Sequence, residues 1–509
     1  NALGSPSGST RVYGRTGASL RLDNGITVAE PITLVGQILP WLNCMTAGGG
    51  SNIITGTLHK ELDASIGTDG GSTLIIRGGV KHVSGGTLYI RNTGSVVFED
   101  KPIEFGTAAA VQVETSGTTV LAVPGNTFST LKIANHAKVR TDVANALPSG
   151  CTLDIGGSWD ADGLLNLNGH DQTVGAIKTD PRWSAPGYLA VTSAAPATLT
   201  VNQGGTTTYA GAFDGAVTLV KNNAGRITIT NVTSTTTGDV ILNGGSIVIA
   251  ETAAFSACST FKVNGGTLEL RSSSALPDMA TVRVLEGAKV SIKDGVTDTV
   301  DKLFLDGEQQ VAGTWGATGS GADHINDSFF SGLGRLNVIS GTQTVYTDAV
   351  WDGGGAGDGF SVAANWDGDA LPSFVGFARA VFATGGSTAT VDMPATFTKM
   401  TFNATADFTV AAGAGALTVG AGGIKAGAPA PTSSSRIFTI TEDLVMGDHQ
   451  FWSVTNNGTG TTYLRANGSI SDGGNAFNLT KRGNGVLILA GDNSYGGVTT
   501  IETNYAIIR

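Results

Sequence analysis

The chain has 509 residues, 74 of them glycine, and combines a hydrophobic fraction of 40% with a charged fraction of only 14%. A disordered low-complexity chain lacks this much apolar surface, so the composition predicts a folded protein. The formal net charge is −11 and Lys and Arg do not cluster, which argues against nucleic acid and anionic membranes as partners. No apolar run reaches the ~18 residues of a membrane-spanning helix, so we expect no membrane insertion.

Short alternating segments recur along the first half of the chain. Each has about five residues, is rich in β-branched side chains and is bounded by glycine-containing turns, as is typical of strands. These segments are TLIIR at 73–77, TLYIR at 87–91, SVVFE at 95–99, TLKIA at 130–134, RITIT at 226–230, SIVIA at 246–250 and TLELR at 267–271. A helical period is almost nowhere sustained over three turns.

A longer repeat becomes visible when the turns are included. The stretches that begin at Asn145, Ala253 and Ser274 each contain a small-residue turn, a strand, a glycine-containing corner and a second strand. Such self-similarity predicts an all-β parallel β-helix (β-solenoid), whose coils bury an apolar strip only by stacking. We expect Leu, Ile and Val inside, Thr, Ser, Asn, Lys and Arg outside, and ladders of Asn and Thr between coils. A string of β-sandwiches is the alternative, and the shortage of core aromatic residues argues against it.

We predict two solenoid segments, residues 1–338 and 351–509, joined by a short polar bridge at 339–350. The chain contains three cysteines, Cys44, Cys151 and Cys258. Cys151 and Cys258 would lie about five coils apart, which is too far for a disulfide. We therefore interpret the cysteines as small buried side chains, with a bridge between chains as the alternative.

The segment at 479–509, LTKRGNGVLILAGDNSYGGVTTIETNYAIIR, resembles the autotransporter-associated β-strand repeat. The resemblance rests on Leu479, Lys481, Gly483, Gly485, Leu487, Leu489, Gly491, Asn493, Tyr495, Gly497, Thr499 and Ile501. The stretches around DGEQQVAGTWGATG and WDGGG also look like parts of large secreted bacterial proteins that carry this repeat. The resemblance implies a right-handed parallel β-helix of passenger type, exported by a bacterium to the cell surface or the extracellular space, in a stalk, adhesin or fibre.

The first and last residues of the sequence together resemble one coil. In the family a Thr-x-Ile strand is usually followed by another strand and a turn like NALG; here NYAIIR closes the sequence and NALGSPSG opens it. We therefore predict head-to-tail self-assembly, between subunits or between repeats of a longer chain, because a contact that does not close on itself gives a filament. The predicted interface consists of Asn1, Ala2, Leu3, Val12, Leu20, Leu22, Tyr505, Ala506, Ile507, Ile508 and Arg509.

An aspartate-rich loop at the start of the second segment is a candidate calcium site. Asp352, Asp358, Asp367 and Asp369 carry the oxygen ligands that calcium prefers. The stretch GGAGD is one residue short of a calcium-binding repeat and occurs once, where that motif needs several copies. We therefore favour a glycine-rich corner in which the aspartates bond their own backbone, and we predict no cofactor.

Carbohydrate chemistry on a β-helix needs paired carboxylates in a groove, or exposed aromatic rings. The densest carboxylate cluster of the first segment, Asp154, Asp160 and Asp162, lies on a turn without a nearby arginine and is interpreted as a solvated loop. Trp351 and Trp366 are interpreted as packing residues. We predict a non-enzymatic structural protein of a bacterial extracellular fibre; a carbohydrate-binding or carbohydrate-cleaving β-helix, or an adhesin passenger, is the alternative.

Overall fold

The computed structural model describes residues 3, 5–36, 42–107, 109–156, 162–179, 189–230, 232–341, 346–376, 378–383, 386–427, 431–502 and 506–508. Apart from two 3-10 turns, Gly14–Thr16 and Ala363–Asn365, the elements of these ranges are β-strands. The strands are mostly parallel and stack as a β-solenoid of about 21 turns, which confirms the predicted fold class. Among the described residues, no helix has the length and apolar character needed to cross a membrane.

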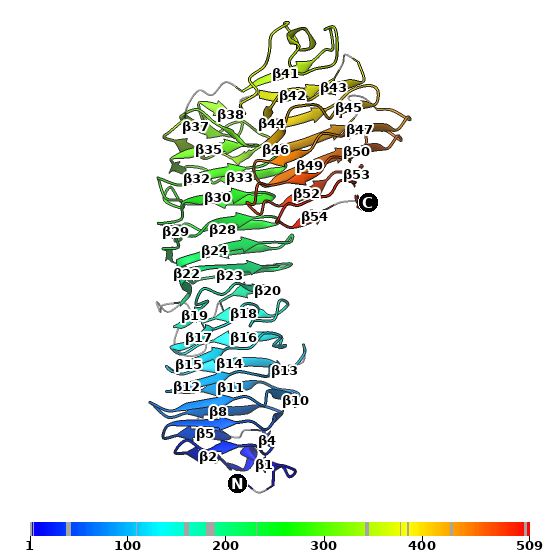
Figure 1. Cartoon of the computed structure of the whole chain (residues 1–509). Coiled ribbons are helices and arrows are strands. Elements are labelled where there is room, and N and C mark those ends of the chain that lie inside the picture. The colour runs from blue at the N-terminus through cyan, green and yellow to red at the C-terminus, as the bar shows by residue number, and fades with distance from the viewer. Residues whose placement is uncertain are drawn as a thin grey trace. The chain divides into compact units, whose positions relative to one another are not determined.

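The chain forms two compact units (Figure 1). Unit 1 comprises Asn1–Leu303 and Ala312–Ser340, and unit 2 comprises Phe304–Val311 and Gly341–Arg509. In the main sheets, each strand pairs with a strand of the next coil, so sequence order follows the order of stacking; the short sheet within residues 297–338 departs from this order. All seven strand segments named from the sequence are observed as strands.

Unit 1 begins with three sheets. The five-stranded sheet contains β1 (Thr10–Val12), β4 (Ile32–Val35), β7 (Leu58–Glu61), β10 (Val80–Ser84) and β13 (Ile103–Glu104). The eight-stranded sheet contains β2 (Leu20–Asp23), β5 (Met45–Gly48), β8 (Ala64–Thr68), β11 (Leu88–Arg91), β14 (Ala110–Glu114), β16 (Thr130–Ile133), β18 (Thr152–Ile155) and β21 (Ala176–Lys178). The third, fifteen-stranded sheet contains β3 (Thr27–Val28), β6 (Ser51–Ile54), β9 (Thr73–Ile76), β12 (Ser95–Phe98), β15 (Thr118–Leu121), β17 (Ala137–Thr141), β19 (Gly163–Asn166), β20 (Gln172–Val174), β22 (Leu189–Val201), β24 (Ala212–Lys221), β27 (Val240–Leu242), β30 (Thr260–Val263) and β32 (Thr281–Val284). Its last two strands are β35 (Lys302–Leu305) and β36 (Glu308–Gln309), whose residues from Phe304 onwards are assigned to unit 2.

Three further sheets complete the later coils of unit 1. A six-stranded sheet contains β23 (Thr206–Tyr209), β25 (Arg226–Ile229), β28 (Ser246–Ile249), β31 (Gly266–Leu270), β33 (Ala288–Ile292) and β39 (Phe330–Gly332). Two short sheets contain β26 (Thr233–Ser234) and β29 (Ala254–Phe255), and β34 (Thr297–Val300), β37 (Gly313–Gly316), β38 (His324–Ile325) and β40 (Arg335–Val338). In the last of these, β37 and β40 run antiparallel.

Unit 2 has two main sheets. The nine-stranded sheet contains β41 (Thr347–Trp351), β42 (Ala378–Phe382), β44 (Ala395–Phe402), β46 (Leu417–Gly427), β48 (Leu444–Met446), β49 (Gln450–Thr455), β51 (Ile470–Ser471), β52 (Leu479–Arg482) and β54 (Thr499–Ile501). The six-stranded sheet contains β43 (Thr388–Thr390), β45 (Phe408–Ala411), β47 (Arg436–Ile440), β50 (Thr462–Ala466), β53 (Val486–Leu489) and β55 (Ala506–Ile508).

The core of unit 1 consists of aliphatic columns that run from coil to coil. Ile90, Val113, Ile133 and Ile155 stand opposite one another in successive strands of the eight-stranded sheet, and all four are buried. This arrangement follows from the period-2 alternation of the strands, which places every second side chain inside. The expected interior of Leu, Ile and Val is therefore observed in unit 1.

The core of unit 2 is rich in aromatic rings, contrary to the shortage of core aromatics that we inferred from the composition. Trp351, Phe382 and Phe402 stand opposite one another in adjacent strands of the nine-stranded sheet. The ring centroid of Phe382 lies 5.1 Å from that of Phe402 and 5.1 Å from that of Phe408. The average over the whole chain hides this local concentration, and the argument against sandwiches holds only for unit 1.

The segment Phe304–Val311 packs within unit 2 through ion pairs. One Glu308 carboxylate oxygen lies 3.0 Å from Arg379 Nη1, and Arg379 Nε lies 2.7 Å from the Asp348 carboxylate. Asp306 forms an ion pair with Lys399. Burial raises the pKa of Glu308, and the charge of Arg379 opposes that rise. Phe304–Val311 therefore belong to unit 2, although the residues directly before and after them in the sequence belong to unit 1.

An asparagine ladder links four successive coils of unit 1. Nδ2 of Asn222 donates to Oδ1 of Asn202 at 3.0 Å, Asn243 donates to Asn222 at 2.9 Å, and Asn264 donates to Asn243 at 2.9 Å. The residues are 20 or 21 positions apart, which is the length of one coil here. The ladder predicted from the outward asparagines is therefore present.

The three cysteines are free and buried, as we expected. Burial raises the pKa of Cys151 and of Cys258 to about 12, so both thiols are protonated and unreactive at neutral pH.

Candidate functional site

The predicted assembly residues near the start of the sequence lie in the first coil of unit 1. Val12 in β1 and Leu22 in β2 are 6% and 1% exposed, so both side chains face the core. Leu3 and Leu20 are half-buried. Within the described chain, β1 and β2 are the end strands of their sheets. Outside the described residues lie Asn1 and Ala2.

The predicted assembly residues near the end of the sequence belong to unit 2. Ala506, Ile507 and Ile508 form β55, whose backbone pairs in parallel with β53. The neighbouring end strand, β54, leaves Ile501 43% exposed. Outside the described residues lie Tyr505 and Arg509. The described members of the two groups thus lie at sheet edges of different units.

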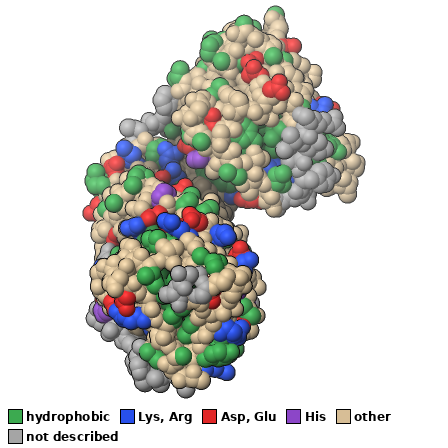
Figure 2. Space-filling view, turned by 60° about the horizontal axis from the view of Figure 1, so that its bottom comes forward, with side chains coloured by type: hydrophobic (Ala, Val, Ile, Leu, Met, Phe, Trp, Pro, Cys, Tyr) green, Lys and Arg blue, Asp and Glu red, His purple; other side chains and the backbone are tan. Residues whose placement is uncertain are grey.

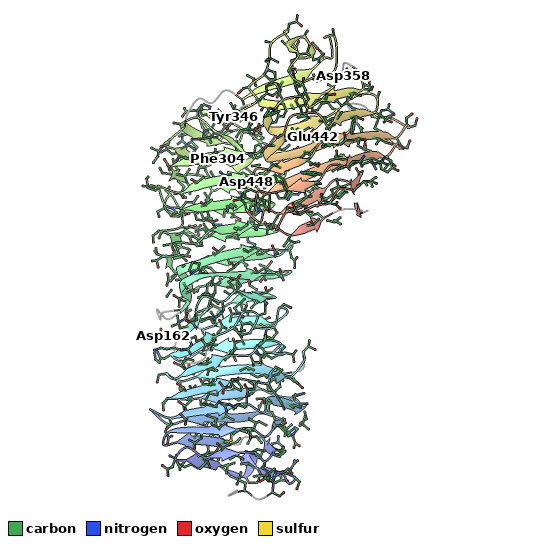
Figure 3. The ribbon with its side chains drawn as sticks, viewed as in Figure 1. Asp162, Phe304, Tyr346, Asp358, Glu442 and Asp448 are labelled. Atoms are coloured by element: carbon green, nitrogen blue, oxygen red, sulfur yellow. The ribbon has the colours of Figure 1, made fainter. Side chains whose placement is uncertain are left out.

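The four aspartates considered as calcium ligands lie in the loops that open unit 2 (Figure 3 labels Asp358). The Asp352 carboxylate accepts a hydrogen bond from a backbone N–H two residues later, at 3.1 Å, as in an Asx turn. Asp369 has a positive φ of 54°. Asp367 follows Trp366, the buried residue that caps the end of the 3-10 turn. In the described part of the chain, no group of three or more His, Cys, Asp or Glu side chains is arranged to hold a metal ion.

Asn365 organises this glycine-rich loop. Its side chain is fully buried. Nδ2 donates to the carbonyl oxygens of Gly357 and Gly359 at 2.8 and 3.0 Å, and Oδ1 accepts from the Gly355 N–H at 2.9 Å. A neutral amide therefore satisfies main-chain groups of the loop that contains Asp358. Sequence reasoning missed this residue, because one Asn in a glycine-rich stretch has no pattern of its own.

Trp351 and Trp366 pack beneath the same loop. Their rings meet edge to face with centroids 5.2 Å apart, and they are 0% and 1% exposed. Nε1 of Trp366 donates to the Phe360 carbonyl at 2.9 Å, which satisfies its polar atom inside the core. The interpretation as packing residues is confirmed. The other tryptophans of the described chain, Trp315 and Trp452, are buried as well.

The carboxylates that the sequence places in one cluster have separate partners. Asp154 is 5% exposed and lies 3.3 Å from Lys178 Nζ. Asp162 Oδ2 lies 2.6 Å from Nδ1 of His136, at the surface (Figure 3). Asp160 lies outside the described residues. Each described carboxylate is thus held by a neighbouring basic side chain. Asp154 lies in β18 and is buried, so the interpretation as a solvated loop is wrong for this residue.

Two lysines, Lys221 and Lys481, point into the core. Both are fully buried and follow a buried leucine, Leu219 or Leu479, by two positions in β24 and β52. We predicted outward lysines, and for these two, as for the fully buried Lys60, the prediction is wrong. The physical reason is that the aliphatic stem extends the apolar column while the ammonium group reaches polar atoms at the corner.

The ammonium group of Lys221 closes the corner that follows β24. Nζ donates to the carbonyl oxygens of Asn222 and Asn223 at 2.7 and 2.8 Å, and to that of Gly244 in the next coil at 3.1 Å. Asn223 has a positive φ of 64°, which turns the chain sharply from one sheet to the next. Burial lowers the pKa of Lys221 to about 8.

Lys481 occupies the same place in unit 2. Its Nζ donates to the Gly483 carbonyl at 2.6 Å, and Gly483 has a positive φ of 78°. Burial lowers its pKa. Both lysines therefore lie two residues after a leucine and two residues before a residue in the left-handed region. This shared spacing is a signal that the sequence contained.

Both lysine corners lie in regions that match a known family. The passenger-associated-transport-repeat matches residues 219–249 and 479–503. The second region lies within the segment whose resemblance to an autotransporter-associated repeat we predicted, and the match confirms that prediction. No curated protein and no solved structure matches the chain.

Proposed function

We propose that this chain, with two copies of the passenger-associated-transport-repeat in a β-solenoid, is a non-enzymatic structural part of a bacterial protein at the cell surface or outside the cell. The repeat and the fold both fit an autotransporter passenger. One observation carries the structural role: the conspicuous polar side chains serve the coils themselves. Asn365 holds a loop, and Lys221 and Lys481 close corners.

The outer surface supports the same role. Positive and negative side chains are interleaved on the face shown in Figure 2. Two ion pairs join successive coils of unit 1: Arg77 to Glu99 at 2.6 Å near the surface, and the largely buried pair of Arg91 and Glu114 at 2.8 Å. A single exposed pair contributes little to stability, so the interleaved charges serve to keep the surface mixed and weakly charged. Sugar stacking favours exposed tryptophans, whereas the tryptophans of the described chain are buried; Tyr13, at 50%, is an exposed ring.

We further propose that the solenoid continues by stacking head to tail, on the next repeat of a longer chain or on another copy. The two matched regions allow the residue opposite Lys221 to be compared with the residue opposite Lys481. Leu242, opposite Lys221, is 1% exposed because Val263 of the next coil stands opposite it. Ile501, opposite Lys481, is 43% exposed. A parallel strand stacked on β54 covers Ile501 as Val263 covers Leu242.

Electron microscopy and light scattering of the purified chain test this proposal. We expect rods that lengthen end to end as the concentration rises. Ile501→Asp should reduce this association, because a charge at the stacking face costs desolvation. Met279→Asp is the matched control, since Met279 is 75% exposed in a turn of unit 1. Rods of constant length at all concentrations would contradict assembly between copies.

A further inference from the structure

We propose that residues 58–66 form a third lysine corner, and that each lysine corner is a binding site for one primary ammonium group, built from main-chain carbonyl oxygens. The two matched regions begin at residues 219 and 479, so this corner lies far from both. In the native chain the lysine side chain itself supplies the ammonium group. Each corner is thus a cage of carbonyl oxygens that can hold a small organic cation.

The spacing of the third corner is the same as that of the other two. Leu58 and Lys60 lie in β7, Leu62 has a positive φ of 59°, and Ala64 and Ile66 begin the next inward-facing strand. The corresponding residues are Leu219, Lys221, Asn223, Gly225 and Ile227 in the first matched region, and Leu479, Lys481, Gly483, Gly485 and Leu487 in the second. The shared pattern is a leucine, a lysine, a left-handed residue, a small residue and an aliphatic residue at every second position.

The contacts of Lys60 repeat those of Lys221. Lys60 is fully buried, and its Nζ donates to the carbonyl oxygens of Leu62 at 2.9 Å and of Gly85 and Gly86 at 2.7 Å. Leu62 belongs to the lysine's own corner, whereas the two glycines belong to the next coil. Lys221 is likewise bonded to its own corner and to the next coil. The ammonium group thus ties two successive corners together.

The column around Lys60 explains why a lysine is accepted inside. Its strand neighbours at the same inward position are Leu34 and His82, so the lysine stem continues the column. Nζ also lies 5.5 Å from the centroid of the Phe105 ring. Burial lowers the pKa of Lys60 to about 8, and the charge of Asp63 opposes that fall. A leucine in the left-handed region is unusual, because its Cβ crowds the following carbonyl. The ammonium contact with the Leu62 carbonyl and the bond from the Leu62 N–H to the Ser84 carbonyl, at 3.1 Å, hold that conformation in place.

The geometry fits an ammonium group. Three carbonyl oxygens at 2.7–2.9 Å match the three N–H donors of a primary ammonium group. Removing the lysine side chain while keeping the corner leaves these acceptors unsatisfied. A small primary ammonium ion can then replace it, whereas a quaternary ion has no N–H to donate.

Hydrogen exchange of the full chain, read by mass spectrometry, tests the proposal. We expect Lys60→Ala to raise the rate of amide hydrogen exchange at least tenfold in peptides that cover residues 58–66 and 80–88. Lys221→Ala should have the same effect in peptides that cover residues 219–227 and 240–248. Lys138→Ala is the control, because Lys138 is exposed on β17. If Lys60→Ala behaves like the control, residues 58–66 are not a lysine corner.

Added cations test the site itself. Methylammonium chloride should restore at least half of the lost protection in Lys60→Ala and Lys221→Ala, and tetramethylammonium chloride at equal ionic strength should not. Equal effects of the two salts, or no effect, would overturn the ammonium site. If the variants do not fold, acylation of the unchanged chain replaces the test: Lys60, Lys221 and Lys481 should label much more slowly than Lys138, and equal labelling overturns the proposal.

Discussion

The two units bury their coils with different side chains. In unit 1, aliphatic columns such as Ile90, Val113 and Ile133 repeat from coil to coil. In unit 2, rings concentrate near the first coils, where Phe360 contacts both Trp351 and Trp366. A uniform column spreads the stability evenly over the coils, whereas a ring cluster places much of it in one region. The difference suggests that unit 2 depends on its first coils more than unit 1 depends on any single coil.

The largest expected effect comes from breaking the ring cluster. Trp366→Ala should lower the free energy of unfolding of unit 2 by about 3–5 kcal/mol, because it leaves a cavity and removes a buried hydrogen bond. Ile133→Val, one methylene from an aliphatic column of unit 1, should cost only about 1 kcal/mol. Denaturant unfolding with hydrogen exchange resolved by unit provides the measurement. Equal losses would contradict the uneven distribution.

The glycine-rich loop above the cluster gives the second test. Asn365→Asp should destabilise unit 2 by about 3 kcal/mol, because a buried carboxylate repels the carbonyl oxygens of Gly357 and Gly359 instead of donating to them. Asn24→Asp, at an exposed turn of unit 1, is the matched control and should change stability by less than about 0.5 kcal/mol. A stable Asn365→Asp chain would show that the amide does not hold the loop.

Much of the fold could be predicted because the strands alternate with period 2 and end at glycine turns. Segments such as SIVIA at 246–250 contain this information locally. The corner sites could not be predicted in the same way. The charge of Lys221 favours the surface, and its acceptors include Gly244, one coil later, which only the stacking of coils brings near. Asn365 was missed for the same reason, since its acceptors depend on how the loop folds back.

A further corner of unit 1 contains a buried carboxylate. Asp298 is fully buried and accepts the Leu276 N–H at 3.0 Å. In an earlier coil, the amide oxygen of Gln172 accepts the Leu147 N–H, also at 3.0 Å, at the same turn of the repeated Ala-Leu-Pro sequence. Burial raises the pKa of Asp298 to about 7. One corner of the repeat is therefore sensitive to pH, whereas its counterpart is not.

This contrast gives the third prediction. Because the folded pKa of Asp298 lies above the unfolded value, its contribution to stability is complete below about pH 4 and is lost as the pH rises towards 7. Asp298→Asn should therefore stabilise unit 1 by about 2 kcal/mol at pH 8 and flatten its stability between pH 4 and 7. Gln172→Glu should introduce a dependence of the same sign as that of Asp298, because a carboxyl group buried at this position should also have a raised pKa. Unfolding curves at several pH values are the measurement, and parallel pH profiles for Asp298→Asn and the unchanged chain would contradict the assignment.

The smallest expected effect lies in the asparagine ladder, which tests whether the coils of unit 1 are coupled side by side. Asn243→Ala removes two ladder bonds, to Asn222 and to Asn264, and should cost about 1 kcal/mol because the ladder is exposed. Asn222→Ala also removes two. The double variant removes three, because the bond between Asn222 and Asn243 is shared, so its loss should be smaller than the sum of the single losses by about 0.5 kcal/mol. A double-mutant cycle by denaturant unfolding measures this coupling. If the loss in the double variant equals the sum of the two single losses, the ladder does not couple these coils of unit 1.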